Sequence, residues 1–154
     1  MNDRMPDGTP FYVLDTERQF IGLVLMCEEK DVLAVNLDRH DFHDRSLGVV
    51  WAAVQEAARK GAAGLPYVSY LLDQAGVLEQ VGSETRLAEL MGNMLRDPLP
   101  VYSYYLEPHA EIIRDWGERR KGLENAQILA RHAMSGTHRR TPVWDRPEYQ
   151  GELS

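Results

Sequence analysis

The strongest constraint on the fold is a stripe of apolar residues at helical spacing in the middle of the chain. Its members recur every three or four residues, the spacing that places side chains on one face of an α-helix. Asp44 precedes the stripe as a candidate N-cap, and glycines at 61 and 64 follow it. The stripe comprises Leu47, Val50, Trp51, Val54 and Ala58.

Other segments also favour helices, and no pair of segments predicts two paired strands. Residues 16–19 (TERQ) have the capping-box pattern, which predicts a helix over 16–27. A short helix is expected over 31–38, and Pro66 suits the first turn of another. We therefore expect an all-α protein. Further helices are predicted over 66–75, from Ser83 through Met94, and over 108–134. We expect the chain to consist of a flexible N-terminal segment (1–14), one helical domain (15–134) and a flexible tail (135–154).

Composition excludes several classes of protein. The 154 residues suffice for one domain, and 17 Lys and Arg against 24 Asp and Glu give a net charge of −7. So negative a surface repels the phosphate backbone of nucleic acids. Cys27 is the single cysteine, which excludes an internal disulfide and fits a reducing cytoplasmic location. No glycine is followed by lysine, so the phosphate-binding loop of P-loop ATPases is absent.

The groups that resemble catalytic or metal-binding sites have simpler structural explanations. His40 and His43 flank Asp41-Phe42, but no second set of ligands accompanies them, and a polar turn with Phe42 in the core explains them better. No nucleophile-elbow motif is present, and the segment over 66–75 lacks the basic residues of a DNA-reading helix. We expect a non-enzymatic protein with no catalytic residue, metal or cofactor.

The last predicted helix carries an apolar stripe for which the chain offers no later helix as cover. A helix over 108–134 would be about 40 Å long at 1.5 Å per residue, longer than a small helical body. Ile112, Ile113, Trp116 and Leu123 form this stripe, and charged residues flank the stripe. An uncovered stripe is normally buried by a partner, which predicts protein–protein association. The residues assigned to this association face are Ile112, Trp116, Arg119, Arg120 and Leu123.

A second hypothesis is nucleic-acid binding. Arg119, Arg120 and Lys121 form the main basic cluster, and Arg139 and Arg140 could extend it. The simpler interpretation is a solvated helix face paired with neighbouring glutamates. Binding through this cluster would weaken steeply with added salt.

Five segments in order resemble the N-terminal domain of DnaB-type replicative DNA helicases. The family pattern AEQxVLGxLL resembles residues 17–25 (ERQFIGLVL), and its DF turn resembles Asp41-Phe42. Residues 47–54 (LGVVWAAV) are similar to its HRxIFxAI helix. The family stretch VTLxxxLxxxGxLxxxGG resembles residues 68–70 (VSY) and 76–83 (GVLEQVGS). The family helix YAxIVRExAxxRR resembles residues 109–115 (HAEIIRD) followed by Arg119-Arg120.

The resemblance implies a small orthogonal bundle of about six helices whose long C-terminal helix begins a hairpin. In that family the hairpins pair into dimers, and three dimers form a collar above the ATPase ring. The collar docks primase and helicase-loading proteins and performs no catalysis. Here the returning helix is missing or reduced to the proline-containing tail after Ser135, Pro108 forces a start or kink in the long helix, and the ATPase domain is absent. The expected partners are a second copy, primase, the replicative helicase or its loader.

Overall fold

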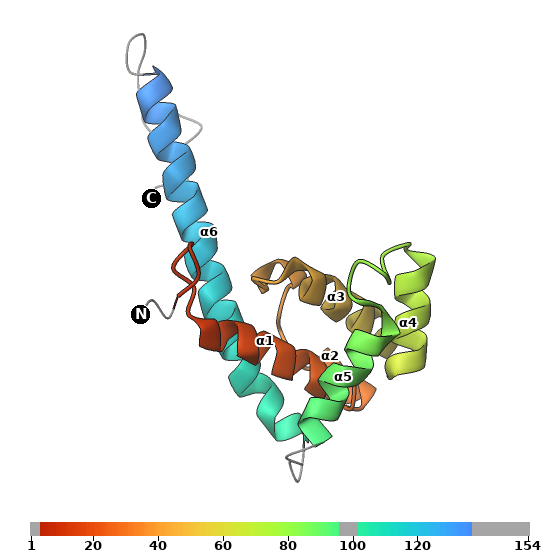
Figure 1. Cartoon of the computed structure of the whole chain (residues 1–154). Helices are drawn as coiled ribbons and strands as arrows, with labels where there is room; N and C mark the ends of the chain where they lie inside the picture. The colour runs from red at the N-terminus through yellow and green to blue at the C-terminus, as the bar shows by residue number, and fades with distance from the viewer. Residues whose placement is uncertain (1–3, 96–101, 137–154) are drawn as a thin grey trace. The chain divides into compact units, whose positions relative to one another are not determined.

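The computed structural model describes residues 4–95 and 102–136, and within these ranges the protein is all-α (Figure 1). The expectation of about six helices with a long last one is confirmed. Outside the helices, the described ranges contain one isolated antiparallel bridge, between Arg4 and Pro10. The α-helices are α1 (Phe11–Val24), α2 (Glu29–Leu33), α3 (Arg45–Arg59), α4 (Leu65–Gln74), α5 (Ser83–Leu95) and α6 (Leu106–Gly136), with short 3-10 helices at Arg39–Asp41 and Tyr102–Tyr105.

The chain divides into two compact units, and the division falls within α6. The first unit runs from Met1 to Gly117 and includes α1 to α5 and the first turns of α6. The second unit runs from Glu118 to Ser154, and its described part is the remainder of α6. No helix in the described ranges is long and apolar enough to cross a bilayer.

Helix α3 lies at the centre of the first unit, packed on α1, α2 and α4, while α5 packs across α1 (Figure 1). All five residues of the predicted stripe are buried on it, which confirms that stripe as the core face. Trp51 is fully buried; its indole nitrogen donates to the Leu37 carbonyl at 2.8 Å, and its ring meets Phe20 edge-on at 5.0 Å. The predicted stripe is therefore the centre of the core.

Helix α1 begins five residues before the predicted start, so the capping box over 16–19 is wrong. The N-cap is Pro10, and the Thr16 hydroxyl donates instead to the Tyr12 carbonyl one turn earlier at 2.8 Å. Residues 11–14, assigned from sequence to the flexible segment, form the first turn. The earlier start has a packing consequence, because it brings Val13 into the core with no exposed surface.

The helix predicted over 31–38 is also shorter than expected. Helix α2 ends at Leu33, and the chain then passes through an extended stretch into the 3-10 helix at Arg39–Asp41. Asp38 caps that 3-10 helix, with its side chain accepting from the His40 amide at 2.7 Å. In a continuous helix the His40 amide would donate to a backbone carbonyl one turn earlier. The Asp38 side chain takes the place of that carbonyl, which allows α2 to end early.

Three glycines allow close backbone contacts in the first unit. A Cβ at Gly22 of α1 would lie 2.5 Å from the Leu90 carbonyl oxygen of α5, and one at Gly48 would collide with the Arg39 carbonyl. A Cβ at Gly117 would lie 2.7 Å from the Cα of Asp41. Gly117 is therefore the point at which α6 meets the turn that contains Asp41.

A buried carboxylate joins α1 to the turn before α3. Glu17 has no exposed surface, and its two oxygens accept from the backbone amides of His43 at 2.6 Å and Asp44 at 3.0 Å. These amides precede α3 and have no partner within the helix. Phe42 is 4% exposed beside them, so the polar-turn interpretation of residues 40–44 is confirmed.

Asp44 caps α3, as predicted. Its carboxylate accepts from the Ser46 amide at 2.9 Å and pairs with Arg86 of α5 at 3.2 Å. Partial burial alone would raise the pKa of Asp44, but the Ser46 hydroxyl, the Arg86 guanidinium and the Leu47 amide outweigh it and hold the pKa below its ordinary value.

This lowered pKa predicts a loss of stability in acid. A carboxyl whose pKa is lower in the folded state stabilises the fold above its ordinary pKa, and this contribution is lost as the pH falls through the folded pKa. Asp44→Ala should therefore lower the free energy of unfolding by about 1 kcal/mol at neutral pH. In urea titrations over a pH series, the difference from the parent should shrink toward zero in acid. A difference independent of pH would contradict this account.

Candidate association face of the long helix

The first unit contains the beginning of the predicted association face. Ile112 and Trp116 of α6 are half-buried, whereas Ile113 is fully buried in the core. The prediction that Ile113 belongs to the uncovered stripe is therefore wrong, because this side chain lies on the core side of the helix. Helix α6 begins at Leu106, so Pro108 is its third residue and lies in the first turn, where a missing N–H costs no intrahelical hydrogen bond.

Trp116 contacts two residues from the beginning of the chain. Its indole nitrogen donates to the Tyr12 hydroxyl at 3.2 Å, and the Arg4 guanidinium lies 5.7 Å from the ring centroid. The second contact has the geometry of a cation–π interaction. Trp116 is thus positioned by α1 and by the residues before it.

The second unit consists, in its described part, of a helix with mostly exposed side chains. Leu123 is 48% exposed, Ile128 42% and Met134 79%. Arg119 is exposed, Arg120 is half-buried, and both make interactions with other residues. Trp144 and Tyr149, which could cover such a face, lie outside the described residues.

The exposed apolar residues of the second unit follow a regular spacing. Leu123, Ala126, Ala130 and Met134 recur at intervals of three, four and four, which places them on one side of α6. This pattern is typical of a seam between two paired helices. Pairing with a second helix along this seam would bury leucine and methionine side chains that are exposed in the single chain.

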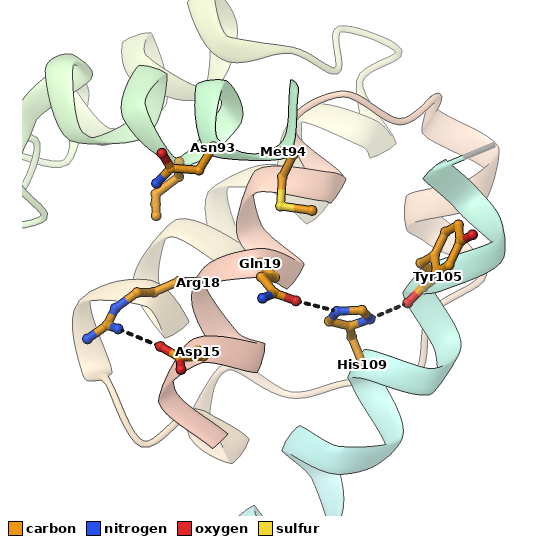
Figure 2. A pocket seen from close by; sticks show the side chains of 8 residues that line it. Asp15, Arg18, Gln19, Asn93, Met94, Tyr105 and His109 are labelled. Carbon is orange, nitrogen blue, oxygen red and sulfur yellow. Dashed lines mark hydrogen bonds and ion pairs between the residues drawn. The ribbon is translucent and has the colours of Figure 1, made fainter. Parts of the chain in front are cut away.

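A separate open groove of about 510 Å³ lies in the first unit between α1, α5 and the start of α6 (Figure 2). His109 joins its walls, with Nδ1 donating to the Tyr105 carbonyl at 2.6 Å and Nε2 3.1 Å from the Gln19 side-chain oxygen. No local sequence pattern indicates this groove, because its residues come from four separate elements: α1, α5, the 3-10 helix Tyr102–Tyr105 and α6. It is lined by Asp15, Arg18, Gln19, Leu90, Asn93, Met94, Tyr105 and His109.

The described residues contain no group of three or more His, Cys, Asp or Glu side chains that could hold a metal ion. The His43 imidazole instead pairs with the Asp7 carboxylate at 2.9 Å. Burial raises the pKa of the Cys27 thiol to about 11, with Asp31 and Glu28 adding to the effect. At neutral pH the thiol is protonated and is a poor nucleophile.

The family model of the DnaB-like helicase N-terminal domain matches residues 9–115. The chain belongs to this family. The match covers most of the first unit and ends one residue before Trp116. It is a match to the N-terminal domain of a replicative helicase, and not to the ATPase domain. The resemblance identified from the sequence is confirmed.

A solved structure supports the same fold for this DnaB-like N-terminal domain. The crystal structure of the N-terminal domain of DnaB helicase from Mycobacterium tuberculosis superposes with a TM-score of 0.73 at 22% sequence identity. The superposition covers 91% of this chain and 95% of that chain. No protein with a curated description matches the chain significantly.

The residues that carry the family likeness have structural roles in this DnaB-like domain. Glu17 binds the amides before α3, Gly22 permits the close contact with α5, and Phe42 fills the core. These segments therefore identify the fold. Of the predicted association residues, Ile112 lies just inside the matched region and the other four lie beyond its end. The association face stays a prediction.

Proposed function

We propose that this DnaB-like domain is a non-catalytic protein–protein interaction domain of DNA replication. It associates with a second copy through the outer face of α6 and docks primase, the replicative helicase or its loader. The association face comprises Ile112, Trp116, Arg119, Arg120 and Leu123, as predicted from the sequence. A cytoplasmic location accompanies this proposal.

One observation carries the proposal: the exposed apolar side chains of the second unit. Leu123, Ile128 and Met134 are each more than 40% exposed on a helix whose described residues 121–128 are all exposed. Exposed apolar residues at seam spacing favour a helical partner, because pairing removes their surface from water. The flanking charges of both signs would select the partner and its orientation.

The proposal is tested by capture of cognate primase and full-length helicase from purified solutions. The parent should retain one or both, whereas Leu123→Glu should reduce the retained amount at least tenfold, because a carboxylate would be buried at the seam. The matched control is Leu33→Glu, which changes a leucine that is 51% exposed on α2. Equal capture by Leu123→Glu and Leu33→Glu would contradict the assigned face, and capture of neither partner would contradict docking.

The same preparation distinguishes the nucleic-acid hypothesis. A mobility shift with single- or double-stranded DNA at low salt would favour binding through Arg119, Arg120 and Lys121. We expect no shift, because the net charge of −7 opposes association with phosphate backbones.

A further inference from the structure

Residues 4–10, here called the N-terminal loop, form a closed structure before α1. Its backbone bonds run from the Met5 amide to the Thr9 carbonyl at 2.7 Å and from the Gly8 amide to the Met5 carbonyl at 2.8 Å. Gly8 has a φ of +89°, which lets the chain reverse direction there. The Arg4 guanidinium donates to the Gly8 carbonyl at 2.9 Å. The loop is therefore an ordered element and holds the Arg4 side chain in place.

Two side chains fix the N-terminal loop to the first unit. Asp7 pairs with the His43 imidazole at 2.9 Å, next to the amide that Glu17 binds. Burial alone would raise the pKa of Asp7, but the Thr9 amide and His43 outweigh it and lower the pKa, so the carboxylate is charged at neutral pH. Arg4 provides the second contact, over the ring of Trp116.

The position of Arg4 matters because Trp116 is the largest apolar side chain of the proposed association face. A guanidinium over one face of the indole occupies the surface on which a partner's apolar side chain would pack. A partner that buries this ring face must displace Arg4. The contact between Arg4 and Trp116 is not needed to hold α1 in place, because α1 is anchored in the core through Val13 and Phe20.

We infer that the N-terminal loop is an autoinhibitory element that competes with a second copy of the chain for Trp116. This inference rests on the proposed function, since it concerns the same face of α6. Asp7 and His43 position the loop, and Arg4 covers the ring. A partner binds more weakly to the parent than to a chain whose loop no longer contacts Trp116.

The competition is tested by measuring the self-association Kd of the full chain with sedimentation equilibrium. Arg4→Ala should tighten association about two- to five-fold, the effect of losing an exposed cation–π contact. Asp7→Asn should act in the same direction, because it keeps the backbone bond to Thr9 but removes the charge facing His43. Arg59→Ala and Asp73→Asn are matched controls that change exposed residues in α3 and α4, and should leave the Kd unchanged.

An NMR measurement tests the contact without requiring association. The Trp116 indole N–H resonance, assigned with Trp116→Phe, should shift in Arg4→Ala, while that of Trp51, bonded to Leu37 in the core, should stay in place. Association that is unchanged or weaker in Arg4→Ala overturns the inference and leaves the proposed function standing. If no variant self-associates, the proposed self-association fails, and an unshifted Trp116 resonance then overturns the loop contact as well.

Discussion

Trp51→Ala should lower the free energy of unfolding by about 3–5 kcal/mol. The side chain is fully buried at the centre of α3, its ring packs edge-on against Phe20, and its indole nitrogen bonds to the Leu37 carbonyl. Truncation leaves a large cavity and removes the shorter of two hydrogen bonds to the Leu37 carbonyl, which keeps only the 3.5 Å bond from the Gln55 side-chain amide. A domain of this size has about 5–15 kcal/mol of stability in total, so the variant should be close to unfolding.

Urea denaturation followed by circular dichroism measures this loss, and Trp116→Ala is the matched control. Trp116 is half-buried at the edge of the first unit, so its removal should cost much less than the removal of Trp51. Trp51→Phe should give an intermediate value, because it keeps aromatic packing but loses the hydrogen bond. Equal losses in Trp51→Ala and Trp116→Ala would show that α3 is not the centre of the core.

Glu17→Ala should lower the free energy of unfolding by about 2–4 kcal/mol, although it removes a charge from the interior. Each carboxylate oxygen accepts from a backbone amide before α3, and an amide left without an acceptor costs roughly 1–3 kcal/mol. The loss should be accompanied by faster hydrogen exchange at the His43 and Asp44 amides, which would identify these amides as the groups affected.

Glu17→Gln is the informative comparison, since it keeps one acceptor oxygen and should cost about half as much. Glu56→Ala is the matched control; its carboxylate pairs with Arg59 on the surface of α3. A Glu17→Ala protein as stable as the Glu56→Ala protein would contradict the role given to the buried carboxylate.

The predictable part of this fold is the part that depends on local sequence. The stripe from Leu47 to Ala58 and the Asp44 cap are periodic or local signals, and both are confirmed. Pro66 also lies in the first turn of its helix, as expected. Such features are decided within one or two helical turns of the chain, where spacing and capping preferences apply.

The features that the sequence does not predict depend on contacts between residues far apart in the chain. Glu17 lies within the predicted capping box of Thr16 and Gln19, which gives it no role of its own, but its carboxylate accepts from amides 26 and 27 residues away. The close approach of Gly117 to Asp41 and the groove around His109 likewise combine separate elements. Local spacing contains no information on these pairings. The family resemblance identified the segments involved but assigned no contact to them.

The two halves of the association hypothesis rest on different observations. Trp116 is held by Tyr12 and Arg4 within the first unit, so its availability depends on the N-terminal loop. Leu123 and Met134 are exposed in the second unit without reference to that loop. A charge introduced at Leu123 should therefore prevent association, whereas changes at Arg4 should only alter the Kd of association.

The most direct test of the central claim is the mass of the chain in solution across a micromolar concentration series, measured by light scattering. The account predicts a mass that rises from 17.6 kDa toward that of a dimer or larger assembly for the parent and for Leu33→Glu, and a constant monomer mass for Leu123→Glu. A parent that stays at the monomer mass throughout the series, or a Leu123→Glu protein that assembles as the parent does, would contradict it.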